Sequence, residues 1–397
     1  MRVLQTVFGV FHHFELAREL ERRGHLQSIY STWPWKRLAR EGLPRTKVHT
    51  FPWLGLPDYL LGQTGLNLPW LQDELGYRNA LAFDSWTTSQ LRSLLRRGEA
   101  PDALIGISGS SLRAGKLLQE HGGIFLCDRG STHQRFQEAI VAEEFRRWGV
   151  SVAVSDERDT LREEAIYNAA DAITVPSSAA RDSFVAMGVP AGKVHVIPYG
   201  VRLEQFLPSG TSPQDEFSVL FAGSVGLRKG VPYLLQAFAD LRVSRKRLRI
   251  VGGVQAELRP LLHRFPLKDV EFLGILSQAE LSGWMSRSHV MVLPSIEEGL
   301  ALVQAQAMAS GCPVLCSTAT GGADLFTDGL EGFIVPVRDS AALTERMQRL
   351  ADDPALQMAM RFASLLRVQD LGGWTTYGDR WEALLQTLVS VGAHHPT

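Results

Sequence analysis

The segment Phe221-Ala222-Gly223-Ser224-Val225-Gly226-Leu227-Arg228-Lys229-Gly230 decides the fold that this sequence predicts. It lies between an apolar run typical of a buried strand and a helical pattern. Glycines in such a turn let backbone N–H groups approach an anion, and the start of the next helix favours negative charge. The adjacent cations Arg228 and Lys229 can hold a diphosphate and stabilise charge that develops on it. The alternative is a glycine-rich turn with solvated basic residues; the glycines alone favour that alternative, and the Arg-Lys pair favours the anion site.

The same alternation of short apolar runs with helix-period segments extends through most of the chain, which is typical of βαβ units and parallel sheets. In the first half we expect a helix over about His12–Arg23 and an irregular, Pro- and aromatic-rich excursion over Trp33–Trp70. The expected strands are Val3–Phe8, Leu26–Thr32, Ala103–Ile107, Ile124–Cys127, Ala172–Val175, Val194–Ile197, Ser218–Ala222, Leu248–Val251, Val270–Leu273, Val290–Leu293 and Pro313–Cys316.

The most linker-like composition is Pro208-Ser209-Gly210-Thr211-Ser212-Pro213, between two halves of similar style. We therefore place a domain boundary between about 200 and 216. A chain of 397 residues is long enough for two domains of about 100–200 residues each. The prediction is an α/β protein with two doubly wound domains that face each other. Ligands of such sheets bind beyond the carboxyl ends of the strands, so the loops there are the candidate site.

Composition excludes several classes of protein. With 41 Lys+Arg against 42 Asp+Glu, the net charge of -1 gives no general attraction to nucleic acid. No run approaches the roughly 20 apolar residues that span a bilayer, and the apolar start, interrupted at Gln5 and Thr6, lacks a signal-peptide cleavage site. Three cysteines fit a reducing compartment. We expect Cys312 and Cys316, at Cys-x3-Cys spacing, to be small buried residues and not a zinc site.

Two further loops follow strands of the second half. Core packing does not explain the acidic pair Glu297-Glu298, which precedes a helix with a buried-looking face. These carboxylates can simply favour the helix dipole, or they can belong to a site with Gln306. Thr320-Gly321-Gly322 is another glycine loop after another strand. All three loops belong to the same predicted sheet edge, so they are expected to converge.

Taken together, these motifs resemble the retaining glycosyltransferases of family 4, which have the GT-B fold of two Rossmann-like domains facing a central cleft. The resemblance spans nearly the whole chain and is most specific over about 215–340. The matching pieces are Phe221–Gly230, Phe272-Leu273-Gly274, Val292-Leu293-Pro294-Ser295, Glu298-Gly299, Ala307–Val314, Thr320-Gly321-Gly322, Asp328–Gly332, Gly24-His25, Val175-Pro176-Ser177 and Ile197–Val201.

The resemblance implies roles on the donor side. Arg228 and Lys229 would contact the donor diphosphate, and Glu298, the first Glu of the family's Glu-x7-Glu motif, would bond the donor sugar. The second motif position is Gln306, which lacks the charge of a carboxylate, and Ala301 stands where the family usually has glycine. The implied donor-binding residues are Gly223, Ser224, Gly226, Gly274, Leu276, Gly299, Leu300, Ala301, Leu302, Gln306, Gly321 and Gly322.

On the first half, the resemblance implies that His133 faces the cleft near the transferred sugar, with a structural histidine as the alternative. Gly9, His12 and His13 would line the other side of the cleft. This loop is bulkier than the family's usual glycine-rich one, which implies a different contact with the acceptor.

The implied domains are an acceptor-binding domain over 1–205 and a donor-binding domain over 206–373, with a last helix at about 374–390 that packs back onto the first. Residues 1–116 hold 15 Lys+Arg against 10 Asp+Glu, which gives either a basic face for an anionic bilayer or ordinary solvated helix faces.

The expectation is a retaining hexosyltransferase that moves a hexose-type sugar from a nucleotide-sugar donor to a glycan, lipid-linked or small-molecule acceptor, in polysaccharide or glycoconjugate biosynthesis. No metal or other cofactor is expected, because the basic pair takes the place of a metal, and no nucleic acid partner is expected. The expected location is cytoplasmic, with peripheral contact to the cytoplasmic membrane face as an addition. Two alternatives stay open: a weakly active or non-catalytic nucleotide-sugar-binding partner of another transferase, and a GT-B-type nucleotide-sugar epimerase.

Overall fold

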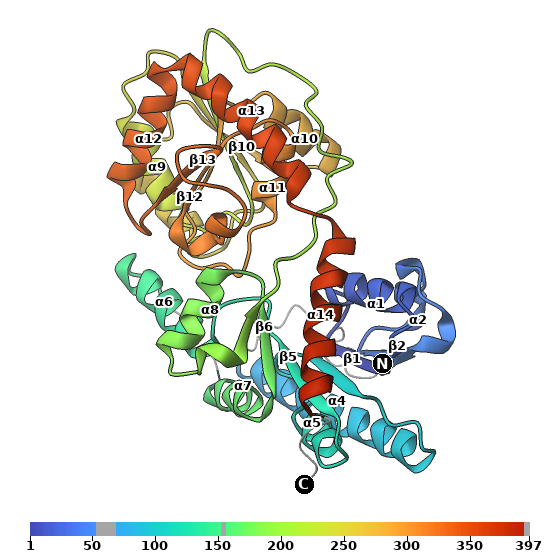
Figure 1. Cartoon of the computed structure of the whole chain (residues 1–397). Helices are drawn as coiled ribbons and strands as arrows, with labels where there is room; N and C mark the ends of the chain where they lie inside the picture. Colours follow the sequence, from blue (N-terminus) through green and yellow to red (C-terminus); the bar gives the residue numbers. More distant parts are fainter. Residues whose placement is uncertain (53–68, 152–155, 393–397) are drawn as a thin grey trace.

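The computed structural model describes residues 1–52, 69–151 and 156–392. The chain forms two parallel sheets, each flanked by helices and each built from one half of the sequence (Figure 1). The predicted α/β class with two doubly wound sheets is therefore confirmed.

The sheet of the first half has seven strands in the order β3-β2-β1-β4-β5-β6-β7, all paired in parallel. All five residues of β1 are buried, as expected for a central strand covered on both faces. The strands are β1 Val3–Val7, β2 Leu26–Ser31, β3 Val48–Thr50, β4 Ala103–Ile107, β5 Ile124–Asp128, β6 Ala172–Val175 and β7 Val194–Val196. The helices are α1 His13–Arg22, α2 Trp35–Leu38, α4 Pro69–Arg96, α5 Leu112–Gln119, α6 Gln134–Arg147, α7 Glu157–Ala169 and α8 Ser178–Ala186.

The sheet of the second half has six parallel strands in the order β10-β9-β8-β11-β12-β13. The strand order reverses direction between β8 and β11, so the loops after these two strands meet at a topological switch point. The strands are β8 Phe217–Ala222, β9 Lys246–Val251, β10 Val270–Gly274, β11 Val290–Leu293, β12 Val314–Ser317 and β13 Gly332–Val335. The helices are α9 Val231–Asp240, α10 Gln278–Ser286, α11 Val303–Ala309, α12 Ser340–Asp352 and α13 Pro354–Asp370.

The eleven predicted strands all occur, with ends shifted by at most two residues. Two strands were not predicted. β3 has only three residues, two of them His49 and Thr50, so it gives no apolar run. β13 begins at Gly332, which weakens a strand pattern. The predicted irregular excursion over Trp33–Trp70 holds α2 and β3, and its residues 53–68 lie outside the described part of the chain.

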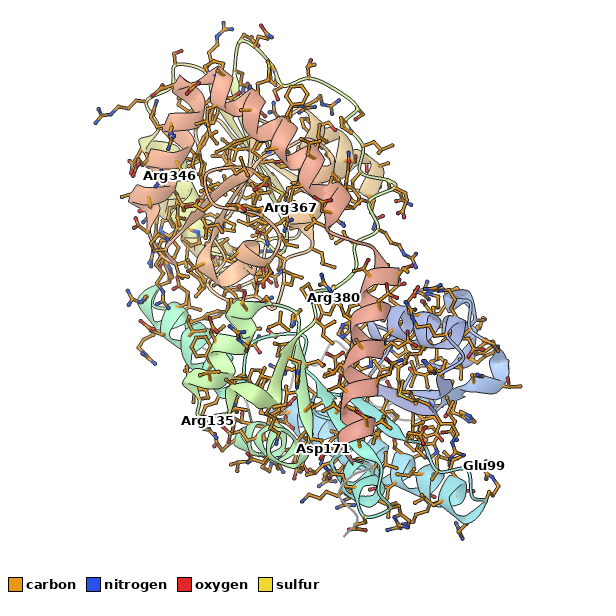
Figure 2. All side chains as sticks on the ribbon, viewed as in Figure 1. Glu99, Arg135, Asp171, Arg346, Arg367 and Arg380 are labelled. Atoms are coloured by element: carbon orange, nitrogen blue, oxygen red, sulfur yellow. The ribbon has the colours of Figure 1, made fainter. Side chains whose placement is uncertain are left out.

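The last helix, α14 (Trp374–Gly392), packs on the first half, against α1 (Figure 1). In Figure 2, Arg367 near the end of α13 and Arg380 on α14 mark where the chain passes from the second half to the first. Arg23 holds the helix through ion pairs to Asp379 Oδ1 at 2.5 Å and to Glu382 Oε2 at 3.2 Å, and His25 Nε2 is hydrogen-bonded to Glu382 Oε1 at 2.7 Å. The Trp381 side chain is fully buried in the apolar core of the first half.

All three cysteines are buried and unpaired, which confirms the expected burial of Cys312 and Cys316. Burial raises the pKa of Cys312 and that of Cys316 each to about 12, so both stay thiols. Across residues 1–52, 69–151 and 156–392, no helix has the length and apolar character needed to cross a bilayer.

Candidate active site

The basic pair lies in the loop between β8 and α9, at the carboxyl edge of the second sheet. Gly230, the residue before α9, has φ +66°, and a Cβ there would overlap the Pro294 carbonyl oxygen. Glycine therefore permits this loop to press against the loop after β11. The Ile296 N–H donates to the Arg228 carbonyl at 2.8 Å and fixes the two loops together. The Arg228 side chain is 39% exposed and that of Lys229 17%.

The acidic pair faces the basic pair directly. Arg228 Nη1 lies 3.0 Å from Glu297 Oε2, and Lys229 Nζ pairs with the Glu298 carboxylate. The Ser295 hydroxyl also donates to Glu298 Oε1, at 3.1 Å. Three residues predicted for the site, Arg228, Lys229 and Glu298, are thus brought together. An anionic ligand at this place meets two cations whose charges are already balanced by carboxylates.

Glu297 joins the two halves, whereas the sequence marked it only as part of the acidic pair and gave the donor-sugar role to Glu298. Glu297 Oε1 accepts from the Ser131 hydroxyl at 2.6 Å and the Thr132 hydroxyl at 2.7 Å, and its Oε2 accepts from Gln137 Nε2 at 3.0 Å. The side chain is 1% exposed. Burial favours the neutral acid, but the hydrogen bonds and Arg228 outweigh it and hold the pKa of Glu297 below its ordinary value. A buried carboxylate with four donors is a fixed anchor for the basic loop.

The main chains of the two halves also meet here. A Cβ on Gly299 would overlap the Gly130 carbonyl oxygen, so this contact requires glycine. The Ser177 hydroxyl donates to the Gly299 carbonyl at 2.5 Å, and the Ser178 hydroxyl donates to Asp324 Oδ1 at 2.6 Å. The loops after β5, β6, β11 and β12 therefore form one continuous contact.

The other residues predicted for donor binding divide by exposure. Gly223, Ser224 and Gly274 are exposed, and Leu276, Leu302 and Gln306 are half-buried. The rest are buried: Gly226, Gly299, Leu300, Ala301, Gly321 and Gly322.

Three of these residues, Ala301, Gly321 and Gly322, already have close contacts within the chain. The Ala301 N–H donates to the Thr320 carbonyl at 3.1 Å, so that amide is already used within the chain. Gly321 lies against Leu300 and Ser177, in the contact between the halves, and Gly322 lies among side chains of the second half. Gly321 is buried because the two halves pack closely at this point. Residue spacing along the sequence does not reveal that packing.

His133 lies at the start of α6, and its side chain enters the core of the first half. It is 3% exposed, with ring centroids 5.0 Å from Tyr167 and 5.1 Å from Phe184. Burial lowers the pKa of His133, which favours the neutral ring. This placement fits the structural alternative for His133, whereas its neighbours Ser131 and Thr132 reach the acidic pair.

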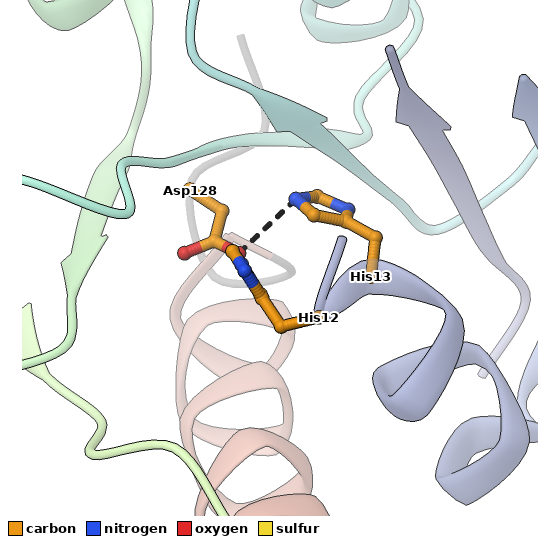
Figure 3. A group of neighbouring side chains, drawn as sticks. All are labelled: His12, His13 and Asp128. Atoms are coloured by element: carbon orange, nitrogen blue, oxygen red, sulfur yellow. Dashed lines mark hydrogen bonds and ion pairs between the residues drawn. The ribbon is translucent and has the colours of Figure 1, made fainter. Parts of the chain in front are cut away.

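His12 and His13, at the start of α1, meet the end of β5. His12 Nε2 lies 2.6 Å and His13 Nε2 3.2 Å from the same oxygen of Asp128, and both rings point at that carboxylate (Figure 3). The Thr174 hydroxyl donates to the other Asp128 oxygen at 2.8 Å. Burial alone would raise the pKa of Asp128, but the two histidines hold it well below its ordinary value.

This cluster borders the contact between the halves, because a Cβ on Gly130 would lie 3.5 Å from the His12 ring. The three ligand atoms lie within 4.8 Å of one another, which makes the cluster the one candidate metal-binding group within the described ranges. Gly9 lies in the buried turn before it, where its N–H donates to the Thr32 hydroxyl at 3.1 Å and its carbonyl accepts from Ser31 at 2.6 Å.

Two family matches cover most of the chain. Residues 12–200 match the family described as glycosyl transferase 4-like domain, and residues 216–353 match the family described as glycosyl transferases group 1. The chain therefore belongs to the group 1 glycosyltransferases, with the GT-B fold.

Among curated relatives, the chain is 33% identical over 240 residues to a D-inositol 3-phosphate glycosyltransferase of Streptomyces avermitilis, covering 54% of this chain and 52% of that protein. It is 30% identical over 258 residues to D-inositol 3-phosphate glycosyltransferase 1 of Catenulispora acidiphila, covering 59% and 61%. The chain thus spans about half the length of these relatives.

Solved structures share the fold over nearly the whole chain. A sucrose-phosphate synthase from Thermosynechococcus elongatus matches with a TM-score of 0.71 at 21% identity, covering 98% of this chain and 100% of that one. HepE of Anabaena in complex with UDP matches with a TM-score of 0.67 at 15% identity, with the same coverage. At these identities the likeness concerns the fold alone.

Proposed function

We propose that this protein is a retaining glycosyltransferase that moves a hexose-type sugar from a nucleotide-sugar donor to a glycan, lipid-linked or small-molecule acceptor. One observation carries the proposal: Arg228 and Lys229 lie at the switch point of the second sheet, beside Glu298, where hydroxyl groups of the first half reach the same cluster. Two adjacent cations suit a diphosphate, and a neighbouring carboxylate suits the hydroxyls of a sugar.

In this proposal the second half, 206–373, binds the donor. The diphosphate takes Arg228 and Lys229 as partners, and Glu298, released from Lys229, accepts hydrogen bonds from the donor sugar. The exposed Gly223 and Ser224 admit the diphosphate from the solvent side. HepE of Anabaena, which has the same fold, has been solved with UDP-glucose, which supports this class of donor.

Retention follows from the resemblance to family 4. The acceptor hydroxyl attacks on the face that the diphosphate leaves, a bond forms from the acceptor oxygen to the anomeric carbon, and the bond to the diphosphate oxygen breaks. The departing diphosphate takes the acceptor proton. Its negative charge then grows beside Arg228 and Lys229, which is the point at which electrostatic stabilisation lowers a barrier most.

We propose that the diphosphate is held without a metal ion, since the basic pair supplies the positive charge. Activity should then survive EDTA followed by gel filtration. A loss of activity that zinc or another divalent ion restores would contradict this and would point to His12, His13 and Asp128.

The acceptor side is assigned to residues 1–205 together with α14, in a biosynthetic pathway for polysaccharide or glycoconjugate in the cytoplasm. Basic residues of the first third would bring the protein to an anionic membrane surface. Part of that positive charge is used internally, as where Arg23 pairs with Glu19, Asp379 and Glu382. Sedimentation with anionic and with neutral vesicles at low salt tests the membrane contact, and equal sedimentation with both would contradict it.

The experiment for the function starts with a thermal-shift panel of UDP-, GDP-, ADP- and dTDP-sugars. The best binder is then incubated with enzyme and acceptors, and NMR of the product gives the anomeric configuration. We expect one donor class to bind and the product to keep the donor's configuration. Inversion contradicts the retaining mechanism, a changed sugar from the donor alone indicates an epimerase, and tight binding with neither hydrolysis nor transfer indicates a non-catalytic partner.

A further inference from the structure

A cavity of about 590 Å³ opens at the carboxyl edge of the first sheet. Phe8 follows β1, Trp33 follows β2 and Ser108 follows β4, and all three line it. The opposite wall comes from α6 and α7, through Gln134 and Asp159. Two aromatic side chains with a few polar groups around them are the usual lining of a site for a small organic ligand.

This cavity is coupled to the candidate active site through two side chains. Gln134 in the cavity wall accepts from Arg129 Nη2 at 2.8 Å, and the same nitrogen donates to Gln137 Oε1 at 2.7 Å. Gln137 in turn donates to Glu297, the partner of Arg228. Hydrogen bonds through Arg129 and Gln137 therefore connect the cavity wall to the cluster where the proposed donor diphosphate binds, and a place on that network suits an acceptor.

The charges around the cavity decide which acceptor it suits. Arg162 lines the cavity, but its Nη2 is paired with the buried Asp84 at 3.0 Å and its Nε donates to the Gly109 carbonyl. Arg129 lies 3.5 Å from Glu163 Oε1, and Glu163 also accepts from the Ser108 hydroxyl. Each of these two cations is thus already matched to a carboxylate.

Asp159 is the unmatched charge. It lines the cavity and has no ion pair among the described residues. Burial, and after it the charges of Asp156 and Glu163, raises the pKa of Asp159. Arg37 has no ion pair to a carboxylate among the described residues. It packs over the Trp33 ring, 5.3 Å from the centroid, and does not line the cavity.

We propose that this cavity binds the ring of a sugar or polyol acceptor, with its flat face on Phe8 and Trp33, and that it selects a ring that carries no phosphate. The inference rests on the proposed function and sharpens its acceptor. An anionic ring would meet the unpaired Asp159, while the lining cation Arg162 is already paired with Asp84, and unpaired like charges are an effective means of rejecting a ligand. The relatives named above are called inositol 3-phosphate glycosyltransferases, so the two specificities are expected to differ.

The test compares matched pairs of ligands on the full chain: myo-inositol with an inositol phosphate, glucose with glucose 6-phosphate, and glucosamine as a cationic ring. Binding is measured by ligand-observed NMR and titration calorimetry, with the nucleoside diphosphate of the best donor present. We expect each neutral or amino ring to bind at least about tenfold more tightly than its phosphate ester. An ester that binds as well as its parent ring overturns the proposal.

Two variants place the site. Trp33→Ala should abolish ring binding, while Trp284→Ala, in the second half, should not change it. Asp159→Asn should reduce the ratio of the ester's Kd to the parent ring's Kd by about threefold or more. Asp182→Asn, which removes an exposed acid elsewhere in the first half, should leave this ratio unchanged. Ring binding that survives Trp33→Ala, or failure of every ring to bind while the nucleotide binds, overturns the cavity assignment. Failure of all nucleotide sugars to bind instead refutes the proposed function. In that case the affinities of the neutral rings and their phosphate esters are compared in the absence of nucleotide.

Discussion

At the residue scale, the most informative side chain is Glu297, which four donors from both halves hold in place. Sequence reasoning pointed to its neighbour Glu298. An acidic pair gives no signal that tells which carboxylate faces which partner, and Ser131 and Thr132 lie about 165 residues away along the chain. Only the folded chain shows that these hydroxyls meet Glu297.

Replacing Glu297 with Gln should weaken the contact between the halves. An amide turns an NH2 group toward the Ser131 and Thr132 donors or toward Gln137 and Arg228, so at least one buried donor loses its acceptor. We expect the free energy of unfolding, measured with urea, to fall by about 1–3 kcal/mol. The matched control Glu345→Gln removes an exposed carboxylate and should stay within about 0.5 kcal/mol. Equal stability of the two variants would show that Glu297 is not an anchor.

Gln306 is the second residue-scale test. If it bonds the donor as the resemblance implies, Gln306→Glu should tighten donor binding by about fivefold, because a charge-assisted hydrogen bond is stronger than a neutral one. Calorimetry with the best nucleotide sugar measures the effect. Gln369→Glu, an exposed substitution at the end of α13, is the control. Unchanged affinity in Gln306→Glu would remove this residue from the donor site.

At the element scale, sequence patterns predicted the buried strands well, because runs such as Val290–Leu293 are continuous and apolar. They failed for β3, which has three residues and follows a Pro- and Trp-rich segment, and for β13, which starts with glycine. Short edge strands owe their conformation to the neighbour they pair with, and a local pattern does not report that neighbour.

The docking of α14 on the first half is also an element-scale property. Trp381 is fully buried there, so Trp381→Ala should create a cavity and lower the free energy of unfolding by about 3–5 kcal/mol. Leu366→Ala, on α13, removes a side chain that is 65% exposed and should cost less than about 0.5 kcal/mol. Urea denaturation followed by far-UV circular dichroism compares them. A cost below 1 kcal/mol for Trp381→Ala would contradict the docking.

At the scale of the whole molecule, five buried or half-buried histidines give stability a common pH dependence. Burial lowers the pKa of His13, His49, His133, His195 and His289. In the unfolded chain these rings take up protons below their ordinary pKa of 6.5, while the folded chain resists protonation. The free energy of unfolding should therefore fall as pH drops from 7 toward 5.

Urea titrations at pH 7.5, 6.0 and 5.0 measure this dependence. His121→Gln, which replaces an exposed histidine that bonds only the Leu117 carbonyl, should keep the wild-type dependence. Stability that stays constant or rises between pH 7.5 and 5.0 would show that these buried rings do not govern it.

The two-sheet architecture was largely predictable because each βαβ unit carries its own local pattern. The meeting of the halves was not, since it depends on backbone approach at Gly130 and Gly299 and on pairs such as Ser131 with Glu297, 166 residues apart. The candidate active site is therefore predicted by its glycine and basic motifs, and completed by contacts that only the folded chain provides.

The central claim is that Arg228 and Lys229 hold a donor diphosphate during sugar transfer. Its most direct test is the kcat for transfer of labelled sugar from the best nucleotide donor, compared between wild type, Lys229→Ala and the control Lys47→Ala, whose lysine pairs with Glu21. We predict that Lys229→Ala lowers kcat by about 10²–10³-fold with a melting temperature close to that of wild type, while Lys47→Ala keeps the wild-type kcat. Transfer by Lys229→Ala at the wild-type rate would contradict the account.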